Sequence, residues 1–382
     1  MRFYASPTPI GTGQGNSWAN AGDLQTMINN AIAASSPGGD EVWALGENNR
    51  FGVTGPYNLA SSPLNITGNT APLSVYGGFR GRERNLCDRN AKIDSTQYPT
   101  FFQNPSILDG GSTNRVIDMQ QANVCRIDGF IIQNGDAGAG DGGGVYVSGA
   151  ANTIWLENIV IMDNEAGNNG GGIASVTFNV MIKNSIFFRN RATNGGGFST
   201  FDGGNAVLVN VLFNANETFR ANGNGNAIYA VGSPNVKIIN STISGNTIGS
   251  SDVYINDSGV EIYNSIIYPD SLVAAVPPTP APTVRVEYCC LPVLPTPPIL
   301  TPNIPSLIIG NPNFMNMATL AMGGNYHLSN TAASQSSCID AGNTGLIFSF
   351  SATDLEGNPR FINGGNPSPF PLEVDMGAFE VQ

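Results

Sequence analysis

The sequence predicts an all-β fold, a parallel β-helix with a short capping helix at its N-terminal end and a loop-rich cap at its C-terminal end. One observation is an internal repeat with a mean period of about 27 residues. Another is the content of each unit, in which short runs of β-branched or aromatic residues are broken by Asn and Gly. A period in the twenties fits a leucine-rich-repeat horseshoe or a parallel β-helix. The L-x-x-L-x-L pattern of the horseshoe is not found, so the β-helix is favoured.

Two rows of Asn mark the repeat. Members of the first row are separated by 26, 26, 30 and 24 residues, and the second row follows the first by 6 residues. We expect both rows to form inward ladders at the coil corners, where each side chain bonds to its counterparts above and below and to local backbone. This structural role is favoured over ligand binding. The first row is Asn158, Asn184, Asn210, Asn240 and Asn264, and the second is Asn164, Asn190, Asn216 and Asn246.

The residues around the Asn rows predict the interior and the corners of the coils. Positions two before and three after each first-row Asn are apolar in every unit, which predicts two stacked rows in the core. An earlier unit at 126–135 fits the same register, with Gly129 and Gly135 at the Asn positions. Glycine accepts the positive φ that a sharp corner needs. Glycine-rich motifs separate the units at 142–145, 170–173 and 195–198.

Both ends of the chain depart from the repeat. Residues 22–35 carry apolar residues at helical spacing, and we expect a helix that covers the exposed strand edges of the first coil. The run at 283–291, between Pro-rich stretches, predicts one further coil with rigid surface loops. Irregular early coils are expected at 40–45, 64–66, 73–79, 106–111 and 115–119. The expected units are 1–39 for the N-terminal strand and capping helix, 40–291 for the solenoid, and 292–382 for the Pro-rich loop and C-terminal cap.

Composition limits the partners. A formal charge of −12 argues against a nucleic-acid partner and against anionic membranes. No run of 18 apolar residues is present, so we expect no membrane span. The acidic, Lys-poor composition favours an extracellular or cell-surface location. Residues 1–13 lack the apolar stretch of a signal peptide, so we expect a signal removed from this numbering or another route of export.

The 5 cysteines leave at least one thiol unpaired within the chain. No C-x-x-C pair suggests a zinc site. Neighbouring cysteines rarely bridge each other, so Cys289 and Cys290 are not expected to pair. A bridge from one of them to Cys338 is left open by the sequence.

Several motifs together resemble a group of secreted bacterial and archaeal β-helix proteins. The Gly-Gly-[Ile/Val] and [Phe/Ile]-x-x-Asn pairs are similar to repeats of polymorphic outer membrane proteins. The segments 11–28, 75–90 and 106–111 with 126–135 resemble the early part of such proteins. Tyr326-His327-Leu328, Cys338-Ile339-Asp340-Ala341-Gly342, Asp354-x-x-Gly357-x-x-Arg360 and Asp375–Glu380 resemble a choice-of-anchor Q domain. The resemblance implies a right-handed, pectate-lyase-like solenoid displayed at the cell surface, with no established catalytic residues. Such domains usually precede an anchoring signal, so we expect the signal to have been cleaved or never present.

Catalysis is the main alternative, because the same fold carries polysaccharide lyases and hydrolases. A hydrolase needs paired carboxylates, and Asp128 and Glu157 occupy one register in successive coils. Lys183 follows at that register in the next coil, which favours a solvent-facing column of charges over a site. The pair is therefore a weak catalytic candidate. Asp136 and Asp141 are weak Ca²⁺ candidates in a Gly/Asp-rich segment that occurs only once.

Charged residues of the C-terminal segment are expected to be structural. His327 is the sole His, so a Ser-His-Asp triad could form only around it. Asp354, Arg360, Asp375 and Glu380 are expected to form a buried ion-pair network rather than a catalytic site.

The function predicted from the sequence is an extracellular structural or adhesive surface protein. We expect no enzymatic activity, no cofactor apart from the possible Ca²⁺, and self-association into a filament or surface layer. The extended residues 1–11 would add to the sheet of a neighbouring copy. A glycan, or a host or cell surface, is the other expected partner. The alternative is a β-helix protein that binds or degrades polysaccharide.

Overall fold

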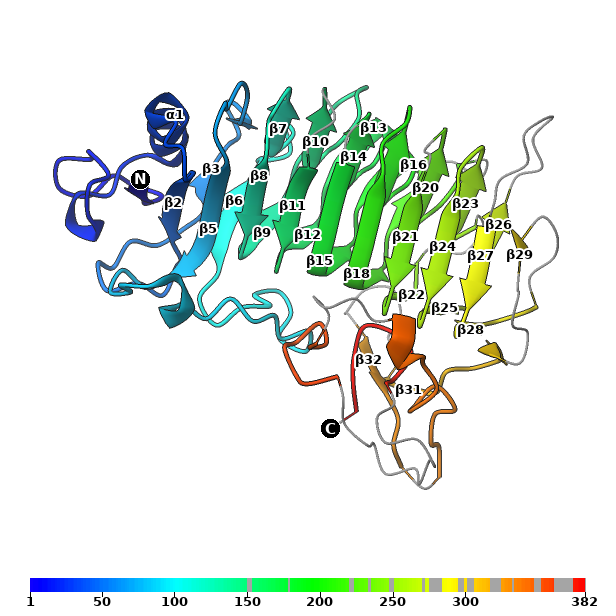
Figure 1. The fold of residues 1–382 in the computed structure, drawn as a ribbon. Helices are drawn as coiled ribbons and strands as arrows, with labels where there is room; N and C mark the ends of the chain where they lie inside the picture. The colour runs from blue at the N-terminus through cyan, green and yellow to red at the C-terminus, as the bar shows by residue number, and fades with distance from the viewer. Residues whose placement is uncertain are drawn as a thin grey trace.

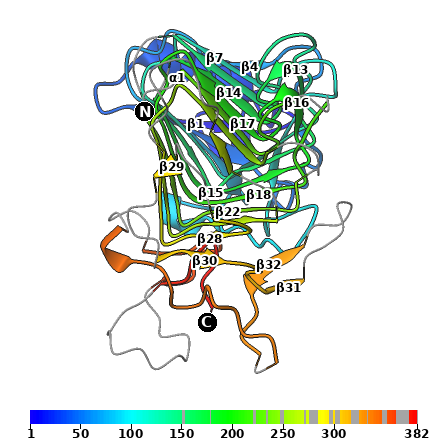
Figure 2. The ribbon, with the colours of Figure 1, turned by 90° about the vertical axis from the view of Figure 1, so that its right-hand side faces the viewer.

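The computed structural model is a parallel β-helix, with its axis along the length of the molecule (Figure 1). From β2 (Asp40–Leu45) to β26 (Leu272–Ala274) each coil contributes strands to three faces, and the paired strands of neighbouring coils are parallel and in register. Figure 2, an end-on view, shows the faces enclosing one interior, so the expected fold class is confirmed. The structure describes residues 1–149, 153–177, 179–219, 223–232, 235–246, 251–269, 272–274, 284–294, 299–300, 306–316, 324–331, 333–346, 352–360 and 374–381.

The strands are grouped by face. The first face holds β1 (Arg2–Ala5), β2 (Asp40–Leu45), β5 (Leu73–Phe79), β8 (Cys125–Asp128), β11 (Thr153–Glu157), the first halves of β15 (Asn179–Phe188) and β18 (Ala206–Asn214), β21 (Val236–Ile239), β24 (Val260–Tyr263), β27 (Val284–Glu287) and β29 (Ile299–Leu300). The second face holds β3 (Tyr57–Asn58), β6 (Ser106–Asp109), β9 (Phe130–Gln133), β12 (Val160–Met162), the second halves of β15 and β18, β22 (Thr242–Ser244), β25 (Ile266–Tyr268), β28 (Cys290–Leu291) and β30 (Ile308–Ile309).

The third face holds β4 (Leu64–Asn65), β7 (Ile117–Gln120), β10 (Val145–Ser148), β14 (Ile173–Val176), β17 (Phe198–Phe201), β20 (Ile228–Val231), β23 (Val253–Asn256) and β26 (Leu272–Ala274). A short sheet between the second and third faces holds β13 (Glu165–Asn169), β16 (Arg191–Asn194) and β19 (Glu217–Thr218). The early strands and the coil at 284–291 lie where the sequence predicted them. The Pro-rich stretches 275–283, 295–298 and 301–305 lie outside the described residues.

The interior is built from the two apolar rows that the repeat predicted. Their members are fully buried, and Phe187 stacks on Phe213 with ring centroids 4.5 Å apart. Burying each such side chain contributes about 1.5–3 kcal/mol, so these rows dominate the stability of the solenoid. The rows are Leu156, Ile182, Leu208, Ile238 and Ile262, and Ile161, Phe187, Phe213, Ile243 and Ile267.

The second Asn row is a buried ladder, as predicted. Asn164 donates from Nδ2 to Asn190 Oδ1 at 3.0 Å, and Asn190 donates likewise to Asn216 at 3.0 Å. Asn216 donates to Asn246 at 3.0 Å. Each Oδ1 also accepts a backbone N–H of the coil before it, which satisfies the corner.

Glycine is required where the coils pack most closely. Gly170 has φ +67°, which suits glycine at the corner. At the next position a Cβ on Gly171 would lie 2.3 Å from the carbonyl oxygen of Arg191. The motif therefore supplies a left-handed turn followed by a position with no room for a side chain.

The N-terminal end is closed by α1 (Leu24–Ala34), as predicted. Asp23 caps it by accepting the N–H of Thr26 at 2.9 Å, and Leu24, Met27, Ile28 and Ala31 are buried. Strand β1 pairs with β2 on one side. On its other side, the N–H of Tyr4 donates to Gly15 and the carbonyl of Tyr4 accepts from Gly22, both at 2.9 Å. Residues 2–5 are thus hydrogen-bonded on both sides, and could add to a neighbouring copy only after leaving these partners.

The outer surface of the second face is covered, as Figure 2 shows. Val160, Ile186 and Leu212 point outward from this face and are buried. They pack against Ile93, Phe101 and Phe102 of the connection between β5 and β6 and against the C-terminal cap, which contains the antiparallel pair β31 (Phe314–Asn316) and β32 (Asn325–Leu328). Cys290 and Cys338 lie in this same apolar cluster, and all five cysteines are free thiols.

Candidate functional site

The first Asn row forms the corner between the first and second faces, and its side chains point outward. This corrects the expectation of an inward ladder. Its members adopt left-handed backbone, with φ between +48° and +56°. The residue after each Asn, such as Ile159 or Ser185, is the one buried in the interior. The two rows have the same Asn-to-Asn spacing, and spacing alone does not determine whether a side chain points into the coil or out of it. The sequence therefore did not distinguish the outward row from the inward one.

The exposed part of this row is a chain of amide hydrogen bonds. Asn158 Nδ2 donates to Asp128 Oδ1 at 3.0 Å, Asn184 Nδ2 donates to Asn158 Oδ1 at 3.3 Å, and Asn210 Nδ2 donates to Asn184 Oδ1 at 2.9 Å. An amide has two donor hydrogens and an oxygen with two acceptor positions. Asn158 and Asn184 each use one donor and one acceptor position in this chain. Each therefore keeps one donor and one acceptor for a ligand.

The rest of the row lies beneath the C-terminal cap. Asn210 Oδ1 accepts from Arg360, and Asn264 exchanges hydrogen bonds with the backbone of Asn343 at 3.0 and 2.8 Å. Asn240 is fully buried, and neither atom of its amide has a hydrogen-bond partner among the described residues. The cap thus ends the accessible part of the row at Asn184.

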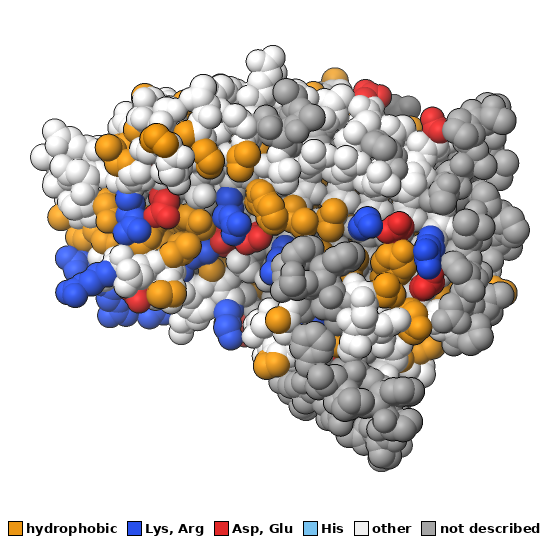
Figure 3. Space-filling view, in the orientation of Figure 1, with side chains coloured by type: hydrophobic (Ala, Val, Ile, Leu, Met, Phe, Trp, Pro, Cys, Tyr) orange, Lys and Arg blue, Asp and Glu red, His pale blue; other side chains and the backbone are white. Residues whose placement is uncertain are grey.

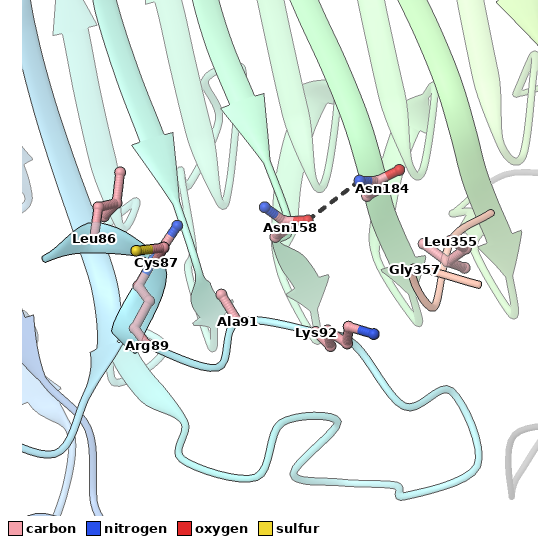
Figure 4. A pocket seen from close by; sticks show the side chains of 9 residues that line it. All are labelled: Leu86, Cys87, Arg89, Ala91, Lys92, Asn158, Asn184, Leu355 and Gly357. Atoms are coloured by element: carbon pink, nitrogen blue, oxygen red, sulfur yellow. Dashed lines mark hydrogen bonds between the residues drawn. The ribbon is translucent and has the colours of Figure 1, made fainter. Parts of the chain in front are cut away.

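A groove of about 560 Å³ lies over Asn158 and Asn184 (Figure 4). One wall comes from the connection after β5, where η2 (Leu86–Asp88) and the residues after it supply Leu86, Cys87, Arg89, Ala91 and Lys92. The opposite wall is Leu355 and Gly357 of the C-terminal cap. Three parts of the chain that are far apart in sequence therefore meet here. The walls carry apolar side chains together with Arg89 and Lys92, and the floor is made of amides.

Asp128 lies behind the wall of the groove rather than in it. It is 4% exposed, and its carboxylate pairs with Arg89 Nη2 at 2.7 Å. Arg89 also donates to the carbonyl oxygens of Gly77 and Asp128 and lies over the rings of Tyr76 and Phe79. Asp128 therefore positions two lining residues, Arg89 and Asn158. The expectation that this carboxylate faces solvent was wrong, because the connection after β5 folds over it.

Glu157 is the register neighbour of Asp128, as predicted, and Lys183 follows it in the next coil. Glu157 pairs with Arg126 Nη1 at 2.8 Å. Burial raises the pKa of Glu157, and nearby Asp128 raises it further, while Arg126 and Lys183 oppose the shift. Asp128, Glu157 and Lys183 thus occupy one register in successive coils, and Arg126 reaches Glu157 from the strand that carries Asp128.

The suggested Ca²⁺ ligands are occupied by protein donors. Asp136 accepts the N–H of Gly138 at 2.7 Å. Asp141 accepts the backbone and side-chain N–H groups of Asn169, both at 2.9 Å. Among the described residues, no three His, Cys, Asp or Glu side chains gather as a metal site. Ca²⁺ binding here stays a prediction.

Arg360 attaches the cap to the solenoid. It is fully buried and donates to Asn210 Oδ1 at 2.9 and 3.2 Å, to the carbonyl of Gly377 at 2.9 Å, and to Glu380 at 3.2 Å. Asp354 accepts the N–H of Glu380 at 3.1 Å. Burial raises the pKa of Glu380 to about 9 and that of Asp375 to about 6. The structure thus gathers the four charged residues expected in a network, with one arginine among three carboxyl groups.

His327 also belongs to the cap. Its Nε2 lies 3.1 Å from Glu356 Oε2 and its Nδ1 lies 2.6 Å from Asn325 Oδ1, and its ring packs on Phe379. This is the structural position expected for it.

The groove walls were missed by the sequence reasoning. The signal present was the basic segment at 80–92, which interrupts an acidic chain. The contribution of Leu355 and Gly357 had no local signal, because it depends on how the cap docks.

Comparisons with known proteins identify the fold. No family model matches the chain, and no curated protein matches it in sequence. Among solved structures, the crystal structure of pectate lyase Pel9A aligns with a TM-score of 0.51 and 14% sequence identity, over 100% of this chain and 96% of that one. At this identity the likeness shows the fold, which is a right-handed parallel β-helix. Within the described residues, no helix is long and apolar enough to span a membrane.

Proposed function

We propose that this protein is an extracellular adhesive protein that binds polysaccharide in the groove over Asn158 and Asn184. The observation that carries the proposal is the row of outward amides fixed at the bottom of that groove. Sugar hydroxyls both donate and accept hydrogen bonds, and each of these amides has one free position of each kind. A row that repeats at the strand spacing of about 4.8 Å suits a ligand that is itself a polymer.

The walls support the same class of ligand. Leu86, Ala91 and Leu355 present apolar surface on both sides of the amide floor. Binding sites commonly combine apolar walls with a few fixed polar groups, which suits the apolar ring faces and polar edges of sugars. The likeness to a pectate lyase gives a precedent for a polysaccharide ligand on this fold, although fold alone does not determine function.

Binding without cleavage is favoured by the state of the carboxylates. Asp128 is paired with Arg89 and shielded by it, and Glu157 is paired with Arg126. Neither carboxylate lines the groove. A general acid or base must come within hydrogen-bond reach of the reacting atom, and both groups are directed to protein partners instead.

Polysaccharide cleavage is the second candidate, because one observation favours it. The raised pKa of Glu157 beside Asp128 is the relation expected of a general acid near a second carboxylate. Incubation with pectin, alginate and xylan, followed by assays for new reducing ends and for unsaturated products, tests it. Cleavage that Asp128→Asn or Glu157→Gln abolishes would replace the binding proposal.

Glycine variants test the groove directly. Asn158→Gly and Asn184→Gly remove the amides and retain the left-handed backbone, and glycine already occupies this corner at Gly129. We expect the double variant to bind a polysaccharide ligand at least about 10-fold more weakly. Asn240→Gly is the matched control, since this residue lies in the same row but under the cap.

Cys87 supplies an independent readout. It is the exposed cysteine and it lines the groove. Bound polysaccharide should slow alkylation of Cys87 in the unaltered protein. The proposal fails if no polysaccharide in a broad panel binds, or if binding neither protects Cys87 nor responds to the loss of Asn158 and Asn184.

Self-association stays a prediction and is not part of this proposal. Its expected route used residues 1–11, and residues 2–5 already form the first strand of the solenoid.

A further inference from the structure

The basic residues of this acidic protein are concentrated beside the groove. The chain has 16 Lys and Arg against 28 Asp and Glu. Five of those cations fall within residues 80–92, which contain only two carboxylates. Figure 3 shows Lys and Arg side chains gathered at one end of the molecule, below the N-terminal strands. The cations of the segment are Arg80, Arg82, Arg84, Arg89 and Lys92.

These cations differ from the others in their pairing. Arg89 is paired with Asp128, but Arg80, Arg82, Arg84 and Lys92 form no ion pair with any described residue. Elsewhere in the described chain, Lys and Arg side chains generally do pair with a carboxylate. Those that pair are Arg2, Arg115, Arg126, Arg189, Arg191, Lys237, Arg285 and Arg360; Arg50 and Lys183 do not.

The two acids in the segment hold its backbone instead. The buried carboxylate of Glu83 accepts the N–H groups of Arg80, Gly81 and Arg82 at 2.8–2.9 Å. Asp88 accepts those of Arg84 and Asn85 at 3.0 and 2.9 Å. The two carboxylates thus accept backbone N–H groups of the connection and do not pair with its cations. The side chains of Arg82 and Arg84 are exposed.

The surface beside these cations is concave and continuous with the groove. A hollow of about 270 Å³ is lined by Arg80, Arg82, Asn90 and Gln103, together with Glu83 and Asp88. The next hollow shares Asn90 and Gln103 with it and shares Lys92 with the groove. Asp94 and Glu356 also line that middle hollow, where Asp94 accepts from Thr96 and Glu356 accepts from Ser95 and faces His327.

We infer that the ligand of the groove is an acidic polysaccharide, a sugar polymer with carboxylate or sulfate groups. This rests on the proposed function and names the class of ligand. The hydroxyl groups contact the amides of Asn158 and Asn184, and the anionic groups lie along the cations from Arg80 to Lys92. Unpaired guanidinium groups bind carboxylate and sulfate through paired hydrogen bonds.

Polysaccharide is favoured over other polyanions by the rest of the surface. Amides and cations line the three hollows, and none of the described residues that line them is aromatic, so the bases of a nucleic acid would have no stacking partner. A net charge of −12 repels a long, densely charged duplex beyond the basic segment. A row of concave hollows also suits a polymer chain better than a flat lipid surface.

Binding of the full chain to defined polymers tests the inference. Polygalacturonate and alginate carry carboxylates, dextran sulfate carries sulfates, and dextran and pullulan are neutral. We expect at least one acidic polymer to bind about 10-fold or more tightly than the neutral ones at low salt, with affinity that falls as salt rises. The two acidic arms show whether carboxylate or sulfate is preferred.

A charge-matched pair of variants locates the binding. Arg82→Gln with Arg84→Gln should weaken acidic polymers by about 5-fold or more and leave neutral ones unchanged. Lys237→Gln with Arg285→Gln removes the same charge from β21 and β27 and should have little effect. Equal affinity for neutral and acidic polymers overturns the inference and leaves polysaccharide binding intact. If no polysaccharide binds, both the inference and the proposed function are overturned. If duplex DNA binds as tightly as the acidic polysaccharides, the site responds to polyanions in general and the inference is overturned.

Discussion

Replacing Arg360 tests how the C-terminal cap is held on the solenoid. In Arg360→Met the side chain keeps much of its length and loses the guanidinium. Asn210 Oδ1 then loses both of its guanidinium donors, and Gly377 O and Glu380 each lose one. The site is fully buried, so water cannot replace these bonds.

The expected loss of stability follows from the burial of the pair formed by Arg360 and Glu380. Removing one partner of a buried ion pair costs about 3–5 kcal/mol, because the other is left without compensation. Here the lower end is expected, since Glu380 has a raised pKa and can hold a proton. A loss of about 3 kcal/mol corresponds to a factor of about 10² in the opening equilibrium of the cap.

Hydrogen exchange followed by mass spectrometry measures this opening locally. Peptides covering 352–360 and 374–381 should lose about 100-fold in protection, whereas peptides from β11 and β15 should change little. Arg191→Met is the matched control, because Arg191 pairs with Glu217 at 2.9 Å but is 46% exposed. An exposed pair of this kind contributes about 0–1 kcal/mol. Equal protection of the cap in the two variants would show that Arg360 does not hold it.

Three further outcomes are expected. Asn190→Ala should destabilise the solenoid by about 3 kcal/mol in denaturant unfolding, because the buried backbone N–H of Asn164 loses its acceptor and the carbonyl of Ile161 and Oδ1 of Asn216 each lose a donor. The exposed Asn168→Ala should cost under about 0.5 kcal/mol. The cap should loosen as pH rises from 6 to 9. In the folded state the pKa of Asp375 is about 6 and that of Glu380 is about 9, both above the values in the unfolded chain. The folded state therefore binds more protons than the unfolded state, and it loses stability as these protons leave. Hydrogen exchange of residues 374–381 at the two pH values, corrected for intrinsic rates, measures this, and Glu380→Gln should reduce the difference. With maleimide at neutral pH, Cys87 should react first, because burial raises the thiol pKa of Cys125 and of Cys289 to about 12; rapid labelling of either would contradict their burial.

The solenoid was predictable because its information is periodic. Stacking places each residue on its counterpart, so the rows containing Leu156 and Ile161 are visible as repeated apolar positions. The second Asn row has the role predicted for it, since a buried corner satisfies its backbone most simply with identical amides. The cap helix was predictable from its own apolar spacing.

The groove was not predictable, because it depends on parts of the chain that do not repeat. The direction of Asn158 follows from the left-handed corner, which the spacing alone does not reveal. The burial of Asp128 follows from Arg89, which lies 39 residues earlier in the chain. Leu355 reaches the groove because its segment docks on Asn210, through Arg360 and through the carbonyl oxygen of Thr353.

The position of the groove depends on where the C-terminal cap and the connection after β5 lie along the first Asn row. One row of outward Asn side chains runs along the corner from Asn158 to Asn264, and any part of it could in principle bind a ligand. The cap seals the row from Asn210 onward, even though the amide of Asn240 then finds no partner in the described part of the chain. Only Asn158 and Asn184 stay open, and the basic connection after β5 lies beside these two. The repeat therefore supplies evenly spaced hydrogen-bonding groups, and the two non-repeating segments determine which of them a ligand can reach and what charge it meets there.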